Sequence, residues 1–391
     1  MSDRPTCRAV AIIGAVIVVC ALAVACGNLL SDPPSTRGDE SSFLDIEQRG
    51  IWLIGGLSGG ANSTVIGAVD LYDPVENVWY PAVTSVPSPV SFAGYAAYDG
   101  KLYVIGGFDS AGTVTSDVQV YTIATGTWET DSAHPLPSAR ANIYATVMNG
   151  KIYVLSGTSA NYNIAWAAAG ICYEYTPVSG WTTKSAYATT ANSERFSYGY
   201  GSTLYHIGGR SGAAAVAALA HDGFAPWYST TGSATSATEV AMSTARTGVA
   251  GVVYDAPEGM VDSVLLFGGF SAISNTTGCF INYGSASAPS ATVSSLVQYL
   301  ASPFASPSAW SANTLSGFPA IAFGAAVVSH TLSNDRIYHF GGTSSLGTSP
   351  GVVSSAYWIS PPAPPATWTD VATSVTAMPR VRWGHGAVTL N

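Results

Sequence analysis

Short apolar runs that end in glycine recur along this chain. In residues 101–107, a lysine and four apolar residues lead directly into a pair of glycines. A brief run of aliphatic and aromatic residues bounded by glycine predicts a short, buried β-strand. Similar runs end at Gly56, Gly157, Gly209, Gly269 and Gly342, at intervals between 50 and 73 residues. Self-similarity at a period of about fifty residues predicts a repeat architecture.

A second apolar run and a tryptophan follow each glycine-ending run. The tryptophans are Trp79, Trp128, Trp181, Trp227, Trp310 and Trp368. Between each tryptophan and the next glycine-ending run there is room for one more strand, so each unit is predicted to hold four short strands. The dipeptides Asp99-Gly100 and Asn149-Gly150 precede two of the runs, and both are typical of two-residue hairpin turns. The first two strands of a unit are therefore expected to pair as an antiparallel hairpin.

Six ordered units over residues 49–391 resemble the kelch repeat, in which glycines follow the second strand and a tryptophan lies in the fourth. The resemblance implies an all-β fold, a six-bladed kelch-type β-propeller. The first unit starts at its second strand, whereas residues 382–391 match opening strands such as residues 140–147. We therefore expect the C-terminal strand to complete the first blade, which removes an open sheet edge. The fourth unit is degenerate at residues 213–218. The fifth has an insertion around residues 279–283, either an added strand or a loop over one face.

Residues 1–26 are typical of an export signal. Arg4 and Arg8 precede an almost unbroken apolar run over residues 9–25, which has the length of a signal-peptide core or a short membrane span. The small residues before Cys26 are similar to a bacterial lipoprotein signal, which implies lipidation of that cysteine and a membrane-anchored protein of the envelope or surface. Cleavage without lipidation, giving a secreted protein, and an uncleaved anchor stay open. Residues 27–48 are polar, and we predict a flexible tether between this segment and the propeller at residues 49–391.

Charge and cysteine content exclude several functions. Charged residues make up 9% of the chain, and the net charge is −9 without a basic cluster, so no nucleic-acid partner is expected. Cys172 and Cys279 fall in the third and fifth units, which would not be neighbours, so we expect no disulfide between them. There is no Cys/His spacing typical of a metal site and no cofactor motif, so we expect neither a metal nor a cofactor.

The longest loops are predicted on one face, where the second and third strands of each unit join. Long loops on a rigid scaffold commonly carry binding residues. Near the axis on this face, basic side chains lie at or close to the starts of the innermost strands: Arg140, Arg195, Arg246, Arg380, Arg382 and His385. Guanidinium groups around a narrow mouth would bind carboxylates, sugar acids or acidic side chains. The alternative is that each arginine hydrogen-bonds loop carbonyls and stabilises the fold.

No catalytic residue is assigned, because the chain has no nucleophile elbow, phosphate loop or zinc-binding helix motif. We predict an exported, monomeric binding or scaffold protein that recognises a protein or a glycan on the long-loop face. The alternative is a carbohydrate-active propeller enzyme. In that case the architecture is similar to that of bacterial sialic-acid mutarotases, which are exported and six-bladed. The resemblance to galactose-oxidase-like proteins is weaker, since no grouping reproduces their copper ligands of two tyrosines and two histidines.

Overall fold

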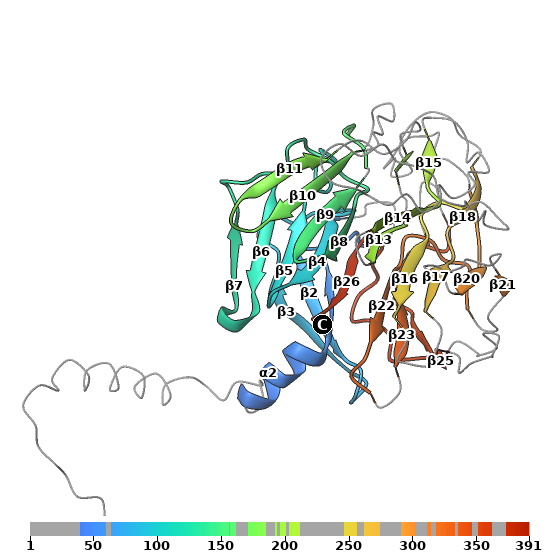
Figure 1. The fold of residues 1–391 in the computed structure, drawn as a ribbon. Coiled ribbons are helices and arrows are strands. Elements are labelled where there is room, and N and C mark those ends of the chain that lie inside the picture. Colours follow the sequence, from blue (N-terminus) through green and yellow to red (C-terminus); the bar gives the residue numbers. More distant parts are fainter. Residues whose placement is uncertain are drawn as a thin grey trace, which may run out of the picture. The chain divides into compact units, whose positions relative to one another are not determined.

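The structure is a computed structural model. It describes residues 40–59, 64–155, 157–161, 171–184, 192–193, 196–200, 203–211, 246–255, 262–273, 291–301, 311–313, 318–332, 335–345, 351–361 and 373–390. The chain divides into two compact units, Met1–Ile46 and Glu47–Asn391, and the second is an all-β propeller (Figure 1). The described helices include none that is long and apolar enough to cross a membrane. The predicted export signal at residues 1–26 lies outside the described residues.

The described residues form five four-stranded antiparallel sheets. The first, β26-β1-β2-β3, comprises Gly386–Thr389, Ile51–Ile54, Ala68–Asp73 and Val78–Ser85. The second, β4-β5-β6-β7, comprises Gly94–Tyr98, Lys101–Ile105, Val118–Thr122 and Thr127–Thr130, with the short 3-10 helix Ile123–Thr125 before its last strand. The third, β8-β9-β10-β11, comprises Tyr144–Met148, Lys151–Leu155, Cys172–Thr176 and Gly180–Lys184.

The other two four-stranded sheets come from the last third of the chain. One, β16-β17-β20-β21, comprises Ala250–Tyr254, Ser263–Phe267, Val297–Ala301 and Ser311–Asn313. The next, β22-β23-β24-β25, comprises Ala325–Ser329, Arg336–Phe340, Ala356–Ile359 and Thr373–Ser374. The sequence predicted six such blades, and the described residues complete five of them.

A two-stranded sheet takes the place of the predicted fourth blade. It pairs β13 (Phe196–Tyr200) with β14 (Thr203–Ile207), and β13 contacts both β8 and β16. Residues 212–245, which the sequence assigns to the outer part of this blade, lie outside the described residues. The innermost strands β26, β4, β8, β13, β16 and β22 contact one another in turn and close a ring.

Two further strand pairs lie outside these sheets, one around the β13–β14 hairpin and one between β17 and β20. β12 (Asn192–Ser193) pairs with β15 (Arg210–Ser211), and β18 (Phe270–Ile273) pairs with β19 (Ala291–Val293). The β18–β19 pair flanks the fifth-blade insertion that the sequence predicted around residues 279–283. Its central residues 274–290 lie outside the described residues.

The ring closes by the pairing that the sequence predicted. β26 pairs antiparallel with β1, with Ile51 opposite Thr389 and Leu53 opposite Ala387. The C-terminal strand therefore completes the first blade, and this prediction is confirmed. β1 is buried along its whole length, because it has a neighbouring strand on both sides.

A helix replaces the last part of the predicted tether. α2 spans Glu40–Arg49 and ends directly before β1. Arg49, in its last turn, donates through Nη2 to Asp73 at 2.7 Å, and its carbonyl accepts a hydrogen bond from Thr331 at 2.9 Å. A basic residue at a helix C-terminus also interacts favourably with the helix dipole. The structure thus differs from the tether prediction over residues 40–48, because these residues are helical.

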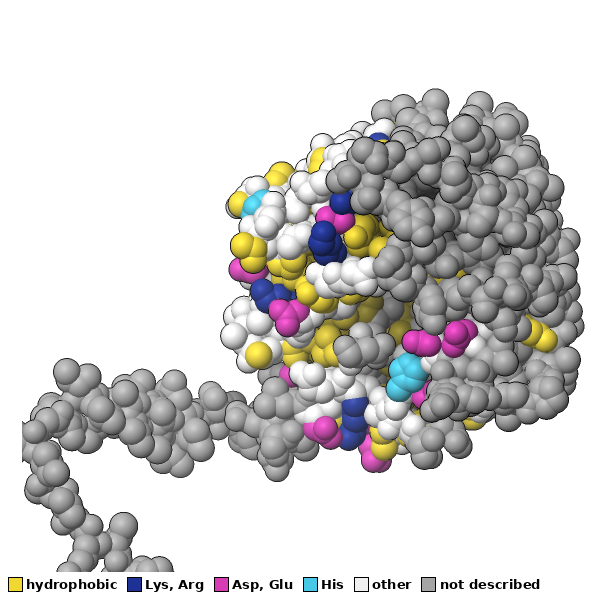
Figure 2. All heavy atoms as spheres, in the orientation of Figure 1, with side chains coloured by type: hydrophobic (Ala, Val, Ile, Leu, Met, Phe, Trp, Pro, Cys, Tyr) yellow, Lys and Arg dark blue, Asp and Glu magenta, His cyan; other side chains and the backbone are white. Residues whose placement is uncertain are grey.

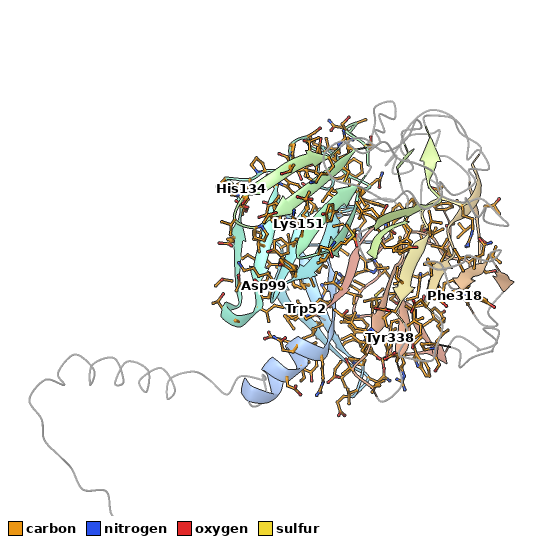
Figure 3. All side chains as sticks on the ribbon, in the orientation of Figure 1. Trp52, Asp99, His134, Lys151, Phe318 and Tyr338 are labelled. Carbon is orange, nitrogen blue, oxygen red and sulfur yellow. The ribbon has the colours of Figure 1, made fainter. Side chains whose placement is uncertain are left out.

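Aromatic side chains fill the space between neighbouring blades, as Figure 3 shows for the labelled Trp52 and Tyr338. Tyr338 lies 5.7 Å from Tyr72 of the first blade between ring centroids, and Trp52 lies 5.9 Å from Tyr121 of the second. Such rings each bury a large apolar area. The recurrent tyrosines of the sequence pattern therefore hold blades together.

The glycine pairs connect each blade to the next. The N–H of Gly107 donates to the carbonyl of Arg140 at 2.8 Å, and the N–H of Gly342 donates to that of Arg382 at 2.8 Å. The preceding Gly106 has a left-handed backbone (φ +60°), and a Cβ there would lie 2.5 Å from the Arg140 carbonyl oxygen. Only glycine combines this conformation with this close approach.

We expect the substitution Gly386→Ala to weaken the closure of the ring. A Cβ at Gly386, in β26, would overlap the ring of Tyr95 in β4, so the two blades would have to separate. The expected cost is about 2 kcal/mol, as for other overpacked interiors, measured by chemical denaturation. The control Gly100→Ala changes a left-handed glycine (φ +68°) that has open space around it, and about 1 kcal/mol is expected. Equal costs for the two variants would contradict tight packing of β26 on the second blade.

Candidate functional site

The innermost strands enclose a central channel with a volume of about 640 Å³. This volume falls within the range of small-molecule sites. The channel is lined by residues of all the inner strands, and its mouth is at their C-terminal ends, where Asp255, His330 and Thr389 line it. In Figure 2, hydrophobic and charged side chains are interspersed over the coloured part of the viewed face.

Aromatic rings close the other end of the channel. Phe92 lies 5.2 Å from Phe323 and 5.5 Å from Trp383 between ring centroids, and all three are buried. Phe108 and Phe270 pack around them from the connections after their glycine pairs. We call these five residues the aromatic plug.

A chain of backbone hydrogen bonds runs around the axis beneath the plug. Asn142 N–H donates to Phe92 O, Phe92 N–H to Gly384 O, Gly384 N–H to Phe323 O and Phe323 N–H to Gly248 O, at 2.8–3.0 Å. All five residues have a left-handed backbone, with φ between +53° and +61°. This conformation is costly for phenylalanine. It is retained at Phe92 and Phe323, where the packed neighbours hold the rings in the plug.

The open end of the channel is opposite to the one that the sequence predicted. The long-loop face was expected to carry an open mouth lined by arginines, but the aromatic plug lies there. The sequence contains a pattern from which the aromatic plug could have been predicted. The residue after the glycine pair is bulky and apolar at Leu57, Phe108 and Phe270, and all three are buried in the plug region.

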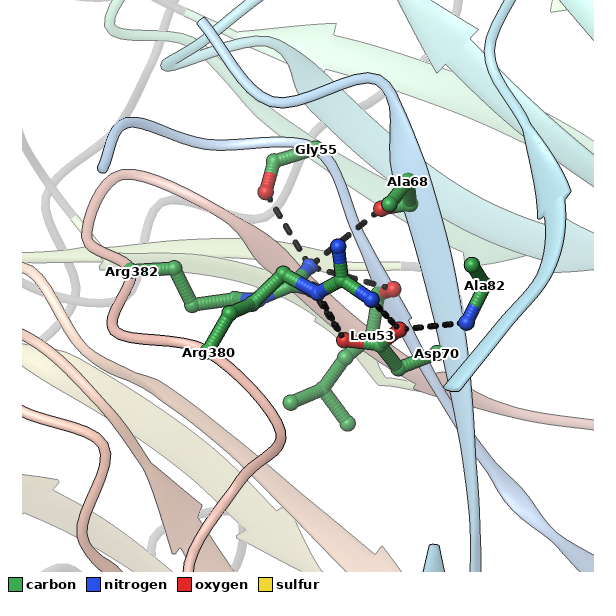
Figure 4. Close-up of polar contacts among 7 residues, drawn as sticks. All are labelled: Leu53, Gly55, Ala68, Asp70, Ala82, Arg380 and Arg382. Atoms are coloured by element: carbon green, nitrogen blue, oxygen red, sulfur yellow. Dashed lines mark hydrogen bonds and ion pairs between the residues drawn. The ribbon is translucent and has the colours of Figure 1, made fainter. Parts of the chain in front are cut away.

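Arg382 is fully buried, and its guanidinium binds its own blade (Figure 4). Its Nη1 donates to the carbonyl of Gly55 at 3.1 Å, and its Nη2 forms an ion pair with Asp70. Arg380 donates through Nε and Nη2 to the two carboxylate oxygens of Asp70, each at 2.9 Å. Asp70 also accepts the N–H of Ala82 at 2.7 Å. Burial lowers the pKa of Arg382 to about 10, while the Asp70 charge opposes this shift, so the guanidinium stays protonated at neutral pH.

Arg246 has the same arrangement in the fifth blade with a neutral partner. It is 1% exposed, its Nη1 donates to the carbonyls of Gly268 and Leu296, and its Nη2 donates to Gln298 Oε1 at 2.7 Å. Gln298 holds the register position in β20 that Asp70 holds in β2. Burial lowers the pKa of Arg246 to about 10. Arg246 has no acidic partner among the described residues, so in this part of the structure hydrogen bonds stabilise the buried guanidinium.

The corresponding contacts differ in two other blades. In the third blade the acceptor position holds another residue, and in the second blade the arginine itself is replaced. Arg140 Nη1 donates to Gly157 O at 3.4 Å, and Tyr173 holds the register position of the acceptor. In the second blade Val90 stands in place of the arginine. The amide of Gln119 hydrogen-bonds the backbone of the preceding linker instead, at 2.8 Å in both directions.

These contacts favour the structural alternative for the predicted arginines. Arg140, Arg246 and Arg382 are buried and donate to carbonyls of their own blades, and Arg380 is occupied by Asp70. They do not form an exposed ring. Arg195 lies outside the described residues, as does Cys26.

His385 differs from the arginines because it lines the channel. It is 6% exposed, and neither ring nitrogen has a hydrogen-bond partner among the described residues. Burial lowers its pKa well below the usual value, helped by the charges of Arg382 and His339. Asn142, also 6% exposed and lining the channel, has an unpartnered Nδ2. The closed end of the channel is therefore lined in part by these two residues, whose unpartnered nitrogens are buried.

The described part of the chain has no cluster of three or more His, Cys, Asp or Glu side chains arranged to hold a metal ion. Cys172 is buried with a free thiol, and Cys279 lies outside the described residues.

The chain is similar to known proteins in one of its repeats and in its fold. A family model described as the Kelch motif matches residues 89–131, which contain the whole second blade. The solved structure titled "Structure of YjhT" matches with a TM-score of 0.54 and 16% sequence identity, over 78% of this chain and 98% of that one. At this identity the likeness supports the fold alone.

Sequence relatives match over shorter stretches. Beta-scruin of Limulus polyphemus is 27% identical over 135 residues, which is 33% of this chain and 14% of that protein. Kelch-like protein 35 of Mus musculus is 33% identical over 107 residues, 27% of this chain and 18% of that protein. The chain thus spans less than a fifth of the length of these two relatives, and the similarity concerns the repeats.

We expect Asp70→Asn to destabilise the propeller by about 3 kcal/mol, because it leaves two guanidiniums, one fully buried, without their counter-charge. Guanidinium chloride denaturation would measure this loss. The control is Asp109→Asn, the same chemical change on an exposed loop, where Oδ1 accepts the N–H groups of Ala111 and Thr113 and an amide oxygen can replace it. A loss of less than about 0.5 kcal/mol is expected for the control. Similar losses in both variants would refute the role of the buried ion pair.

Stability should fall as the pH drops from about 7.5 to about 5.5, through the buried histidines. Burial lowers the pKa of His339 to about 3 and that of His385 well below 6.5. In this window the unfolded state therefore takes up protons that the folded state does not, and protonation favours unfolding. Each histidine should cost about 1.4 kcal/mol over the window.

The variant His339→Phe tests this pH dependence. The His339 ring lies 5.0 Å from the Phe318 ring and 5.6 Å from the Phe267 ring between centroids, so phenylalanine suits the site. Melting temperatures across the window should fall less steeply in the variant than in the wild type. An unchanged pH slope would show that His339 is protonated in the folded state or does not contribute.

Proposed function

This chain is a kelch-repeat protein, and we propose that it is a binding protein whose ligand, a glycan or a short protein segment, occupies the central channel. The observation that carries the proposal is the channel itself, with about 640 Å³ of volume, one end closed by the aromatic plug and the other open at Asp255, His330 and Thr389. A blind, preformed cavity on a rigid scaffold is the usual form of a small-ligand site.

The lining favours binding over catalysis. A propeller enzyme is expected to bring several acidic and histidine side chains together in its funnel. Among the described lining residues, the only carboxylate is that of Asp255, which lies at the mouth with His330, whereas His385 is at the closed end. A single lining carboxylate supports a binding role rather than the mutarotase-like or oxidase-like alternative.

We also propose that the propeller has six blades. Two observations support this number: β13 and β14 lie in the ring of inner strands between the third and fifth blades, and the repeat pattern of the sequence continues through this part of the chain with Trp227.

For localisation, we propose export and attachment to a membrane through a lipid on Cys26. The support is in the sequence: Arg4 and Arg8, the apolar run at residues 9–25, and the small residues that precede the cysteine. Such an anchor would hold the channel outside the cell, where a glycan or a protein segment is available.

We expect a ligand of the channel to be excluded by Thr389→Trp, because Thr389 is a half-buried residue at the mouth and a large ring there narrows the entrance. Thermal unfolding with a panel of sugars, sugar acids and short peptides would first identify a ligand. At about 100 times its Kd, a ligand adds about 2.7 kcal/mol to the free energy of unfolding. The shift in melting temperature should be lost in the variant.

A matched control is Thr130→Trp, which adds the same ring on the exposed outer strand of the second blade. It should keep the full ligand-induced shift. If Thr389→Trp also keeps the shift, while substitution of a loop residue such as Asp109 abolishes it, the ligand binds the long-loop face and the channel proposal is wrong.

Lipidation predicts that Cys26→Ser abolishes incorporation of labelled palmitate and releases the protein from the membrane fraction of a bacterial host. Cys20→Ser, a change of the same kind within the apolar run, should leave both properties intact. Membrane attachment that survives Cys26→Ser would instead support an uncleaved anchor, and release without any labelling of the wild type would support plain cleavage.

A further inference from the structure

We infer that the ligand of the channel is the extended end of a polypeptide, which pairs through its backbone with the channel-facing edge of β8. This inference rests on the proposed function, that the channel is the binding site, and it chooses the protein segment over the glycan. Three observations carry it: the strand register at the axis, the backbone groups that this register leaves without a partner strand, and the width of the channel.

The inner strands leave one row of backbone groups without a partner strand. Each of the six strands β26, β4, β8, β13, β16 and β22 pairs with a single neighbour in its sheet, so its other edge faces the axis of the ring. In an antiparallel edge strand, alternate residues direct both N–H and C=O away from the sheet. The channel is therefore walled in large part by backbone donors and acceptors.

In β8 the residues that face away from the sheet are Ala145 and Val147. The two-residue turn before Lys151 has a left-handed backbone at both positions (φ +50° and +71°), which makes Met148 and Lys151 a hydrogen-bonded pair. The register then alternates along the strand, so the N–H and C=O groups of Ala145 and Val147 point toward the axis. Both residues line the channel and are half-buried, so part of their surface stays accessible.

Neighbouring side chains do not use the β8 edge. Elsewhere in the ring such side chains bond channel-side backbone groups: the Gly199 N–H donates to Thr146 at 3.0 Å, and the carbonyls of Val249 and Val328 accept from Tyr144 and Thr389 at 3.0 and 3.5 Å. No bond of this kind reaches Ala145 or Val147 in the described part of the chain. In β4 only Tyr95 of the two outward residues lines the channel, and β26 is one residue shorter than β8. Unpaired backbone groups in a confined site are costly, so an occupant that pairs with them is favoured.

The spacing of these backbone groups matches an extended chain better than a sugar ring. Along a strand edge the outward N–H and C=O groups repeat every second residue, at about 6.8 Å, and another extended chain has the same repeat. Peptides add to exposed sheet edges in this way. β8 has five residues and is about 17 Å long, so it can pair with a segment of the same length.

The width of the channel fits one extended chain. A volume of about 640 Å³ over the length of β8, about 17 Å, gives a mean cross-section of about 38 Å². A strand in stacked sheets occupies about 48 Å², from spacings of about 4.8 and 10 Å. One chain with small side chains therefore fits, and two do not. Because the aromatic plug closes the far end, this chain must enter by one of its termini.

The test is calorimetric titration of the full-length protein with the capped pentapeptide acetyl-Ala-Gly-Ser-Ala-Gly-amide and with two sugars, galactose and N-acetylglucosamine. We expect the peptide to bind and the sugars not to bind. The same peptide with phenylalanine in place of both alanines should not bind, because the channel is too narrow for large side chains. Thr389→Trp should abolish binding of the first peptide, which locates it in the channel.

Two changes test the backbone pairing itself. In ester analogues of the peptide, alternate amide N–H groups are replaced by oxygen while the side chains stay the same. Because only alternate N–H groups face the paired edge, one set of esters should raise the Kd about ten-fold and the other set should change it little. In the protein, Ala145→Pro removes an N–H that faces the channel, at an edge position where a sheet tolerates proline. This variant should also raise the Kd about ten-fold.

The matched control is Thr130→Pro in β7, the outer edge strand of the second blade. The Asp131 N–H donates to Val118 O, so the N–H of the preceding Thr130 points away from its sheet, as that of Ala145 does. The control should bind the peptide with the wild-type Kd. Melting curves of both variants show whether the fold is intact, and if Ala145→Pro does not fold, the ester analogues decide the pairing alone.

The outcomes distinguish the inference from the proposed function. Failure of the peptide to bind overturns the peptide inference, and sugar binding that is lost in Thr389→Trp would then leave the channel as the site. Peptide binding that neither set of esters weakens, or that a folded Ala145→Pro variant keeps unchanged, would overturn the pairing with β8. If a probe binds equally well to Thr389→Trp, the channel is not the site, and both the inference and the proposed function fail.

Discussion

The convergence of the inner strands on a single axis is the constraint on which this structure depends. Backbones meet there at distances that leave no room for a Cβ, so glycine pairs follow the second strands and donate their N–H groups to the next blade. The same crowding explains the left-handed residues that begin the inner strands, including Phe92 and Phe323, whose conformation is held by the packing of the plug. Closure then requires a partner for the first blade, and β26 supplies it from the other end of the chain.

Buried arginines are the second consequence of this geometry. The carbonyls at the ends of the second strands turn away from the sheet ladder, and guanidinium groups satisfy them in the first, third and fifth blades. The free-energy cost of burying these guanidinium groups is offset by different partners in different blades. Asp70 neutralises Arg382 directly, whereas Gln298 gives Arg246 only a hydrogen bond. In the second blade a valine replaces the arginine, and Gln119 pairs with a linker backbone. The residue at this position stabilises the blade in each case, although the residue type and its partner differ.

The proposed binding function follows from the part of the central channel that the aromatic plug leaves open. Because aromatic rings fill one end of the axis, the channel is blind, and its described interior has few charged groups. Buried polar atoms without partners among the described residues occur at several places, and His385 and Asn142 are two that line the channel. A rigid cavity with aromatic walls is suited to holding a small ligand in one orientation.

The sequence alone determined the repeat, the strand order within a unit and the closure by the C-terminal strand, because these depend on local pattern and on a missing strand that residues 382–391 match. It also indicated the roles of the glycines and tyrosines, whose demands for space are local. The tertiary structure alone decided which end of the channel is open, since this depends on side chains from several blades that meet only at the axis. For the same reason it separated His385, which is among the residues that line the channel, from Arg382, three residues earlier, which binds Asp70. The helix at Glu40–Arg49 was also beyond the sequence pattern, because the contacts of Arg49 come from the first and last blades together.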